Sequence, residues 1–507
     1  MTSPADLHPQ DEHNEKLVDH VHPPDWVNPD PAPRYNLVAI GGGAAGLISA
    51  MGTAGLGGKA AIVERHWLGG DCLNYGCVPS KALIRAAHAA ADVRRAHEYG
   101  VIVPDGVRVD FPVVMERMRR LRAQIAPNDS ADRLRGMGVD VYFGQAKFSG
   151  PETIDVDGKT LRFRRAVIAT GARGAVLPIP GLADAGYLTN ENIFSLTELP
   201  TRLAVIGSGP IGCELAQSFA RFGSQVTLLE AKGQILTRED PDAAVIVQRA
   251  MVKDGVALRF NADILRVEKR GNEKAIVYQQ EGQEHEACVD EILVGVGRTP
   301  NVGGLGLDVA GVRYDERRGV EVDDYLQTSN HRVYAAGDIC LNFKFTHTAD
   351  ATARIVVRNA LMPGPKTRVS TLTVPWCTYT DPEIAHVGMY AKDAEERSIA
   401  TDTFVQELGD VDRAILEGED EGFVKVHAVK GKGEILGATI VARHAGEMIS
   451  EITALMVGKQ GLGTLANTIH PYPTQAEAIK RVGDAYMRSR LTPTVAAIFR
   501  TWMKWTR

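Results

Sequence analysis

The chain has no long apolar segment and no excess of positive charge. None of its hydrophobic runs approaches the roughly 18 residues that a membrane-spanning helix requires, and the opening residues MTSPADLHPQDEHNEKLVDH are polar and acidic. We therefore predict neither a transmembrane helix nor a secretory signal, and expect a cytoplasmic protein. Because 57 Lys and Arg residues stand against 63 Asp and Glu residues, a formal net charge of -6, no nucleic-acid partner is indicated.

Cysteine is also scarce, with six residues in 507. So few cysteines exclude a disulfide-stapled secreted module, and any close pair becomes a candidate for redox chemistry or metal binding. Cys72 and Cys77 form the one close pair in the sequence. The other four are isolated, and we expect each to be a small buried hydrophobic residue: Cys213, Cys288, Cys340 and Cys377.

Glycine, by contrast, is plentiful. The 51 glycines show no collagen-like period and indicate many tight turns or close backbone approaches, while a length of 507 residues predicts two to four domains. Residues 1–33 are rich in Pro, Asp and His and lack apolar periodicity, so we expect them to be a disordered, solvated tail.

Two segments share one pattern of strand, glycine turn, helix and second strand. The first reads YNLVAI, GGGAAG, LISAMGTAGL and KAAIVE, and the second reads RLAVI, GSGPIG, CELAQSFARFG and QVTLLE. Gly41 precedes Glu64 by 23 residues, and Gly207 precedes Glu230 by the same interval. Such a glycine turn, followed by an acid at the end of the second strand, is typical of a Rossmann-type site, so two bound dinucleotides are predicted.

Each motif residue has a predicted role. The first glycine permits the turn, the second lets the backbone approach a pyrophosphate, the third allows close helix–strand packing, and the acid accepts hydrogen bonds from a ribose. Because Glu230 would repel the 2′-phosphate of NADPH, NADH is favoured, although Lys232 and Arg238 could weaken that preference. The residues are Gly41, Gly43, Gly46 and Glu64 in the first site and Gly207, Gly209, Gly212 and Glu230 in the second.

The cysteine pair lies in the segment GGDCLNYGCVPSKALI. Five helical residues advance about 7.5 Å, more than the roughly 4.4–6.8 Å that a disulfide allows between Cα atoms, so the segment must leave regular helix. Gly76 supplies the freedom, and Pro79 suits a first helical turn, which places Cys77 at a helix N-terminus where the dipole favours a thiolate. Lys81, one turn on, adds positive charge.

Beside two nucleotide sites, this pair predicts an electron relay from nicotinamide to flavin to disulfide. A structural cross-link and two buried free thiols are the alternatives.

From about residue 34 to 485 the chain resembles the FAD-dependent pyridine nucleotide-disulfide oxidoreductases. The resemblance rests on GGGAAG, GGDCLNYGCVPSK, VIATGA, GSGPIGCE, GVGRTPN, AAGDI and HPYPTQAEA, which occur in the family's order. It implies an α/β protein with two Rossmann-like dinucleotide-binding domains, for FAD and NAD(P), and a C-terminal α+β dimerisation domain. The implied boundaries are 34–186 and 317–366 for FAD, 187–316 for NAD(P), 367–485 for dimerisation and 486–507 for a basic amphipathic helix.

The resemblance also assigns roles. Cys72 would be the interchange thiol, Cys77 the thiolate against the flavin, and Lys81 would pair with Glu214. A homodimer is implied, with an active site that two subunits share. Arg298 and Asn301 would close the nicotinamide domain. Further residues would bind the cofactors: Gly70, Lys81, Thr170, Gly171 and Asp338 for FAD, and Gly297 for NAD(P).

Departures from the family pattern bear on the substrate. Tyr472 stands where disulfide-reducing members place a catalytic His, and His470 is displaced by two residues. A tyrosine is a poor proton acceptor at neutral pH, so the pattern resembles the mercuric reductase-like members, whose acceptor is a thiophilic metal ion, Hg(II). The chain nevertheless lacks the C-terminal cysteine pair of those members. Asp71 and Pro210 also differ from the usual family residues.

Two other functions remain open. A lipoamide or other small-disulfide reductase would use Glu477 with Tyr472 or His470 for proton transfer, and a redox-silent FAD-binding scaffold is the alternative of another class. No structural metal is predicted.

The C-terminal segment is itself unusual. Thr492 and Pro493 are typical of a helix start, and five cations but no acid follow Asp484. Packing on the dimer is the expected use, with contact to an anionic membrane surface as the alternative. Along one face of the predicted helix lie Val495, Ile498, Phe499, Trp502 and Trp505.

Overall fold

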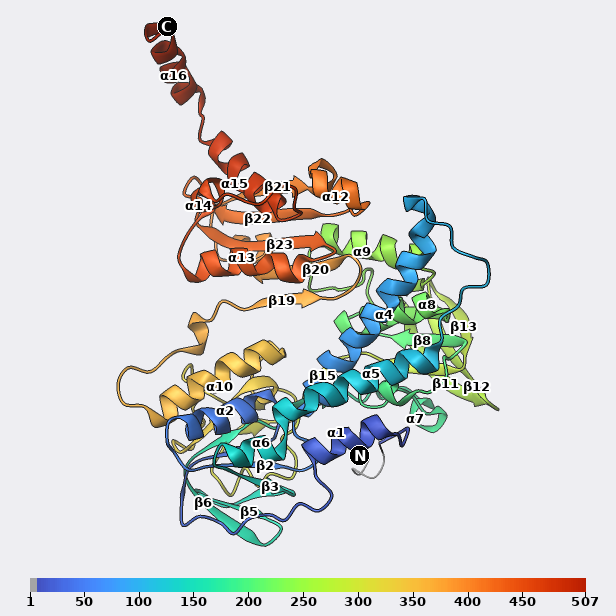
Figure 1. The fold of residues 1–507 in the computed structure, drawn as a ribbon, viewed down its shortest axis with the longest axis vertical. Coiled ribbons are helices and arrows are strands. Elements are labelled where there is room, and N and C mark those ends of the chain that lie inside the picture. Colours follow the sequence, from blue (N-terminus) through green and yellow to red (C-terminus); the bar gives the residue numbers. More distant parts are fainter. Residues whose placement is uncertain (1–6) are drawn as a thin grey trace. The chain divides into compact units, whose positions relative to one another are not determined.

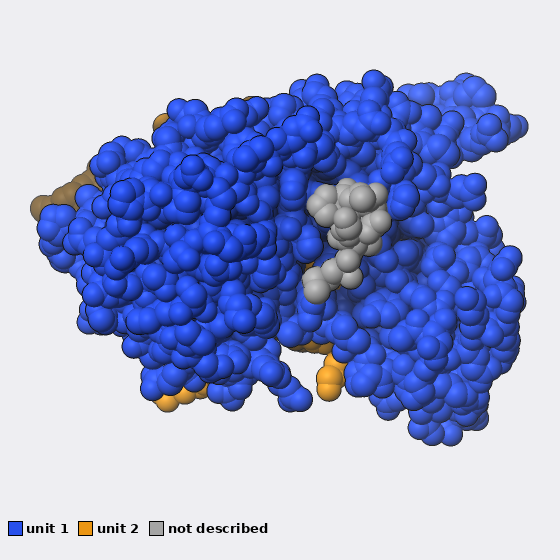
Figure 2. Space-filling view, turned by 90° about the horizontal axis from the view of Figure 1, so that it is seen from below, with its two compact units in different colours: residues 1–207, 218–229, 262–372 blue, residues 208–217, 230–261, 373–507 orange. Residues whose placement is uncertain are grey.

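The computed structural model describes residues 7–507 and divides into two compact units. The first comprises residues 1–207, 218–229 and 262–372, and the second comprises residues 208–217, 230–261 and 373–507 (Figure 2). Both units combine sheets with helices (Figure 1), so the predicted α/β class is confirmed. The domain boundaries drawn from the sequence stay predictions.

The main sheet of the first unit has seven strands in the order β3-β2-β1-β6-β5-β4, with β18 paired to β6. Strands β1, β2, β3, β6 and β18 pair in parallel, whereas β4, β5 and β6 pair antiparallel. The strands are β1 (Tyr35–Ile40), β2 (Ala60–Glu64), β3 (Val139–Phe143), β4 (Ala146–Gly150), β5 (Thr153–Val156), β6 (Lys159–Ile168) and β18 (Val333–Ala335).

This sheet separates two hydrophobic cores. Leu37 and Ala39 face one core, whereas Val38 and Ile40 face the other, because successive side chains of a strand point to opposite faces. Helices α2 and α10 pack against each other over the first core (Figure 1). The main helices of the unit are α2 (Ala44–Gly55), α3 (Gly70–Asn74), α4 (Cys77–Arg95), α5 (Phe111–Ile125), α6 (Ala131–Gly136), α7 (Leu182–Ala185) and α10 (Thr346–Leu361).

The N-terminal segment is ordered, so the predicted disordered tail is wrong for residues 7–33; residues 1–6 lie outside the described part. Helix α1 (Glu12–Val21) begins at Asp11, whose side chain accepts from Asn14 N, and packs on α5. Its Leu17 and Val21 are fully buried. Two buried apolar residues one turn apart are enough to hold α1 in place, because they complete a hydrophobic core that the rest of the unit supplies. Periodicity within the tail does not reveal that core.

A second parallel sheet carries the second glycine motif at the end of its strand β8 (Arg202–Ile206). Strand β8 pairs on one side with β9 (Gln225–Glu230) and on the other with β14 (Glu291–Val294). Helix α8 (Pro210–Phe222) follows β8 in the chain. The smaller sheets of the first unit are β11 (Asp263–Arg270), β12 (Glu273–Gln280) and β13 (Gln283–Val289), then β7 (Ala172–Gly174) with β15 (Arg298–Pro300), and β16 (Tyr314–Asp315) with β17 (Gly319–Val320).

The second unit is built on a five-stranded antiparallel sheet of order β19-β20-β23-β22-β21. Helix α13 packs on β20 and β23, and α15 packs on β21 and β22. The strands of the second unit are β10 (Ala257–Phe260), β19 (Pro375–Thr378), β20 (Glu383–Gly388), β21 (Thr401–Glu407), β22 (Phe423–Val429) and β23 (Ile435–Ala442). Its helices are α9 (Pro241–Lys253), α11 (Ala391–Glu396), α12 (Asp412–Glu417), α13 (Ala445–Val457), α14 (Leu462–Asn467), α15 (Glu477–Ser489) and α16 (Pro493–Trp505).

Within residues 7–507, no helix is both long and apolar enough to cross a membrane. All six cysteines, each in the described part of the chain, are free thiols. Cys213 is buried as predicted, but Cys288 is exposed, because it lies on the solvent side of β13, a strand at the edge of its sheet.

Candidate active site

The first glycine turn joins β1 to α2. Gly41 has a φ of +107°, and a Cβ placed on Gly46 would overlap the Gly41 carbonyl oxygen, so a side chain is excluded at the helix start. Gly43 caps α2 without a side-chain hydrogen bond, which leaves backbone N–H groups at the helix N-terminus. A Cβ on Gly70 would lie 2.6 Å from the Gly43 Cα atom, so these two glycines bring the turn against the start of α3.

Glu64, at the end of β2, braces this turn. Its Oε2 accepts from Gly42 N at 2.6 Å, and its Oε1 accepts from His66 N at 2.7 Å. Burial raises the pKa of Glu64, although these hydrogen bonds oppose the change. Each carboxylate oxygen has a further lone pair for a hydroxyl donor. A side-chain-free turn, exposed helix N–H groups and an adjacent carboxylate fit the pyrophosphate and ribose of a dinucleotide.

The second glycine turn, between β8 and α8, repeats this arrangement with one difference. Glu230 accepts from Ser208 N at 3.0 Å and also from Ser208 Oγ at 2.6 Å, while Lys232 N donates to its other oxygen at 2.9 Å. The Ser208 hydroxyl was not among the predicted residues. The signal was available in GSGPIG, where a hydroxyl residue directly follows Gly207.

The cysteine segment breaks out of regular helix, as its spacing predicts. Helix α3 ends at Asn74, the chain leaves helix at Tyr75 and Gly76, and Cys77 is the first residue of α4. Pro79 lies in the first turn of α4 and is buried. The helix N-terminus therefore directs its partial positive charge toward Cys77.

The two sulfur atoms share a hydrogen bond that polarises them in opposite directions. The pKa of the Cys77 thiol is lowered, chiefly because Cys72 donates a hydrogen bond to its sulfur, and burial opposes the shift. Thr346, at the start of α10, lies with its Oγ1 atom 3.4 Å from the Cys77 Sγ atom and lowers the pKa further. The Lys81 charge acts in the same direction. The same bond to Cys77, together with burial, raises the pKa of Cys72.

Lys81 reaches Ser80 Oγ at 3.4 Å. Glu214 accepts from Tyr379 N at 2.9 Å. The pairing of Lys81 with Glu214 stays a prediction.

Asp71, whose role the sequence leaves open, forms part of a half-buried charge cluster. Its Oδ2 accepts from Arg298 Nη2 at 2.8 Å, and its Oδ1 accepts from Asn190 Nδ2 at 2.8 Å. Arg298 Nε also lies 3.7 Å from an Asp338 oxygen. Burial alone would lower the pKa of Arg298, but the attraction of Asp71 and Asp338 is larger and raises that pKa. The pKa of Asp338 is raised by burial, against the attraction of Arg298 and Lys344.

Thr170 and Gly171 meet the GVGRTPN segment directly. Thr170 Oγ1 donates to Asn301 O at 3.0 Å, and Asn301 Nδ2 donates to Thr170 O at 2.9 Å. Asn301 N also bonds Gly171 O at 3.0 Å. Gly297, with a φ of +55°, precedes Arg298 at the start of β15. These predicted residues are therefore brought together within the first unit.

The C-terminal predicted residues lie in the second unit. Tyr472 is 70% exposed, and its hydroxyl donates to Asp412 Oδ2 at 2.8 Å, a bond that raises the pKa of the phenol. Glu477 Oε1 accepts from Arg481 at 2.9 Å, while its Oε2 is buried without a hydrogen-bond partner among the described residues.

His470 Nε2 lies 3.0 Å from Glu451 Oε1, so the His470 and Tyr472 side chains contact different acids. Their approach to the cysteines of a second subunit stays a prediction. Across residues 7–507, no group of three or more His, Cys, Asp or Glu side chains is arranged to hold a metal ion.

Comparison with known proteins covers most of the chain. Residues 35–353 match the family model described as pyridine nucleotide-disulphide oxidoreductase, and residues 374–482 match its dimerisation domain. A mercuric reductase from Staphylococcus aureus is 34% identical over 446 residues, which are 88% of this chain and 81% of the relative. A dihydrolipoyl dehydrogenase from Mycoplasma pneumoniae is 32% identical over 452 residues, 88% of this chain and 97% of the relative.

Solved structures give the same result. The HOCl-induced flavoprotein disulfide reductase RclA from Escherichia coli is similar with a TM-score of 0.79 and 28% identity, covering 89% of this chain and 99% of that one. LpdA from Mycobacterium tuberculosis is similar with a TM-score of 0.80 and 28% identity, covering 90% of this chain and 99% of that one.

Proposed function

The chain belongs to the pyridine nucleotide-disulphide oxidoreductase family, and on that premise we propose that it uses NAD(P)H to reduce a thiophilic metal ion, Hg(II), through the Cys72–Cys77 pair. Members of the family use FAD and NAD(P)H and carry a dimerisation domain that supports a homodimer. Bound FAD supplies two-electron redox chemistry between the nicotinamide and the cysteines. The side-chain-free turn at Gly41, the carboxylate of Glu64 and Asp338 are the residues that would hold it.

Oxidation of NAD(P)H to NAD(P)⁺ delivers two electrons, which break the Cys72–Cys77 disulfide and leave one thiol and one thiolate. Cys77 is the thiolate because its sulfur accepts the Cys72 hydrogen bond at a helix N-terminus. Binding of Hg(II) displaces the Cys72 proton to solvent and leaves two thiolate ligands on the ion, and transfer of two electrons to the ion re-forms the disulfide.

The observation that carries the metal assignment is the state of Tyr472. Reduction of a disulfide substrate needs a base that takes the Cys72 proton and returns it to the leaving thiolate, but a phenol whose pKa is raised by Asp412 stays protonated at neutral pH. A metal ion displaces the Cys72 proton to solvent on binding and leaves no thiolate that must be protonated. The 34% identity to a mercuric reductase points in the same direction.

A second candidate, reduction of lipoamide or another small disulfide, is favoured by the contact of His470 with Glu451. A histidine held by a carboxylate at 3.0 Å is an acid–base pair, and it stands two residues from the position of Tyr472. The resemblance to a dihydrolipoyl dehydrogenase supports the same reading.

One turnover panel separates these candidates. The FAD-loaded protein is supplied with NADH or NADPH and with Hg(II), other metal ions, lipoamide or low-molecular-weight disulfides. We expect Hg(II)-dependent oxidation of NADH to be fastest and to be lost in Cys72→Ser but kept in Cys288→Ser, a matched change at an exposed thiol. Lipoamide turnover well above metal-dependent turnover, and its loss in His470→Gln, would establish the second candidate instead.

NADH is proposed as the preferred donor. Both oxygens of Glu230 are already engaged, by Ser208 and by Lys232 N, so the carboxylate is fixed and charged where a 2′-phosphate would have to lie.

A further inference from the structure

Helix α16 is an independent element with no buried residue. The structure describes all of Pro493–Trp505, and none of these residues is buried. The helix nevertheless has a defined start, because the Thr492 side chain accepts from Val495 N at 3.3 Å and Pro493 occupies the first turn. It also lies beyond residues 374–482, which match the dimerisation domain. The helix is therefore an addition to that domain. The sequence of α16 specifies a helix, but none of its residues is buried against the rest of the chain.

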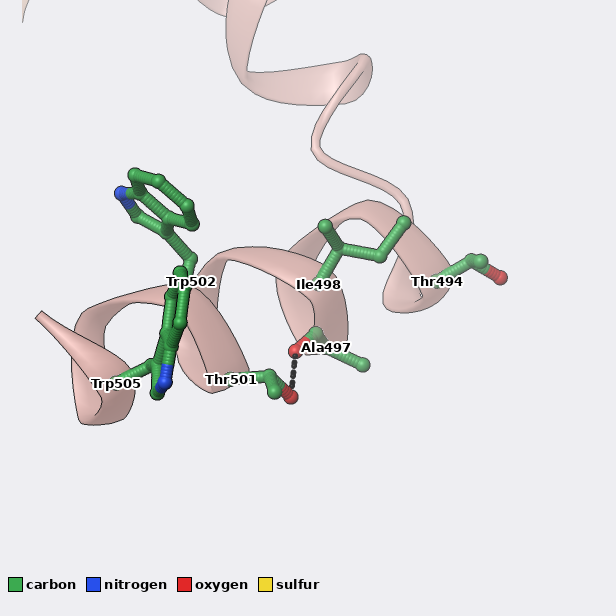
Figure 3. A pocket seen from close by; sticks show the side chains of 6 residues that line it. All are labelled: Thr494, Ala497, Ile498, Thr501, Trp502 and Trp505. Carbon is green, nitrogen blue, oxygen red and sulfur yellow. Dashed lines mark hydrogen bonds between the residues drawn. The ribbon is translucent and has the colours of Figure 1, made fainter.

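One side of α16 is strongly apolar. Ile498 and Trp502 project from the same side of the helix (Figure 3), and the Trp502 and Trp505 rings are 5.7 Å apart. At about 100° per residue, the apolar side chains fall within roughly half the helix circumference. The large exposed members are Ile498 at 63%, Phe499 at 53%, Trp502 at 53%, Met503 at 63% and Trp505 at 80%.

The other side of α16 is basic. Arg500 and Lys504 lie opposite the tryptophans at the same helical spacing, Arg507 follows the end of the helix, and Arg488 and Arg490 precede it. No acid follows Asp484, so the segment carries five positive charges in a chain whose net charge is -6. Tryptophan and phenylalanine on one face with Lys and Arg on the other are the features of helices that lie in a membrane interface.

We propose that α16 docks the protein on an anionic membrane surface, with its tryptophan face among the lipid headgroups and acyl chains and its basic face toward the phosphates. The helix has 13 residues, too few to cross a bilayer, so it lies along the surface. Pairing with the α16 of a second copy would bring together two segments of five positive charges each. Anionic phosphate headgroups are complementary to that charge, and the docking is independent of the electron acceptor.

The test uses full-length, FAD-loaded protein with vesicles of phosphatidylcholine alone or mixed with phosphatidylglycerol, at low and high sodium chloride. We expect flotation with the anionic vesicles only, and release by high salt. Trp502→Ser with Trp505→Ser should weaken binding at least about tenfold, because two large apolar side chains are removed from the interface. Arg500→Glu with Lys504→Glu should abolish it.

A matched control replaces two exposed apolar residues of the first unit, Ile102→Ser with Val176→Ser, which are 94% and 74% exposed. Its flotation should equal that of the parent, and all variants should retain FAD and NADH oxidation. Anionic flotation that survives the tryptophan changes would overturn the proposal. The proposal would also fail if the parent dimer did not bind vesicles and a truncation lacking residues 491–507 sedimented as a monomer. Helix α16 would then stabilise the dimer instead.

Discussion

Replacement of Cys72 with alanine should raise the pKa of the Cys77 thiol, because it removes the hydrogen bond that contributes most to the stability of the Cys77 thiolate. A hydrogen bond to a charged acceptor contributes about 1.5–3 kcal/mol. Since one pKa unit corresponds to about 1.4 kcal/mol, the expected increase is roughly one to two units. Below both pKa values, the thiolate fraction of Cys77 should therefore fall between about 10-fold and 100-fold.

The assay follows the alkylation rate of Cys77 against pH in FAD-loaded protein that has been fully reduced, with each cysteine quantified by peptide mass spectrometry. The midpoint of the Cys77 profile should move to higher pH in Cys72→Ala and less far in Cys72→Ser, whose hydroxyl can still donate. Cys288 provides an internal reference in the same samples, because it is exposed on β13 and separate from the pair. Its profile should not move.

Thr346→Val supplies a second check, since it removes the other donor to the Cys77 sulfur and should produce a smaller shift in the same direction. An unchanged Cys77 profile in Cys72→Ala would refute the assignment of the hydrogen bond as the main cause. If only Thr346→Val or Lys81→Met moved the midpoint, the thiolate would depend on those groups instead.

Three further predictions concern stability and cofactor choice. Leu17→Ala should destabilise the packing of α1 by about 2–5 kcal/mol, because Leu17 is fully buried. Hydrogen exchange of α1 measures this loss, and unchanged exchange would mean that the helix does not pack on its neighbours. Burial raises the pKa of Glu383 to about 7, so its contribution to stability is present below about pH 4 and is lost as the pH rises through 7. Glu383→Gln should therefore gain stability over the parent at pH 8 but not at pH 4, measured by urea unfolding, and equal effects at both pH values would contradict this. Glu230→Ala should raise the kcat/KM ratio of NADPH to NADH about tenfold, because it removes the charge that opposes the 2′-phosphate, whereas an unchanged ratio would mean that Glu230 does not select the donor.

Some features of the site follow from residues close together in the chain. The glycine turns depend on positive φ values at Gly41 and Gly207 and on the close approach of Gly46 to the Gly41 carbonyl oxygen, so the motif alone identifies them. The start of α4 at Cys77 follows in the same way from Gly76 and Pro79, and the start of α16 from Thr492 and Pro493. Local backbone preferences determine these turns and helix starts, so the sequence predicts them directly.

Other features depend on contacts between distant parts of the chain. The N-terminal segment is polar and without periodicity, yet Leu17 and Val21 are buried because α5 and its neighbours provide the surface that they cover. Composition describes only the segment itself, and it cannot report a core that other segments supply.

The sequence by itself determined the two glycine motifs, the position of Cys77 at a helix N-terminus and the amphipathic character of the C-terminal helix, since each is a matter of spacing along a few turns of chain. Only the tertiary structure decided what surrounds the cysteines. Thr346 lies 269 residues from Cys77, and Arg298 lies 227 residues from Asp71, yet both pairs are in contact. Folding sets those distances, and the pKa of the Cys77 thiol depends on them.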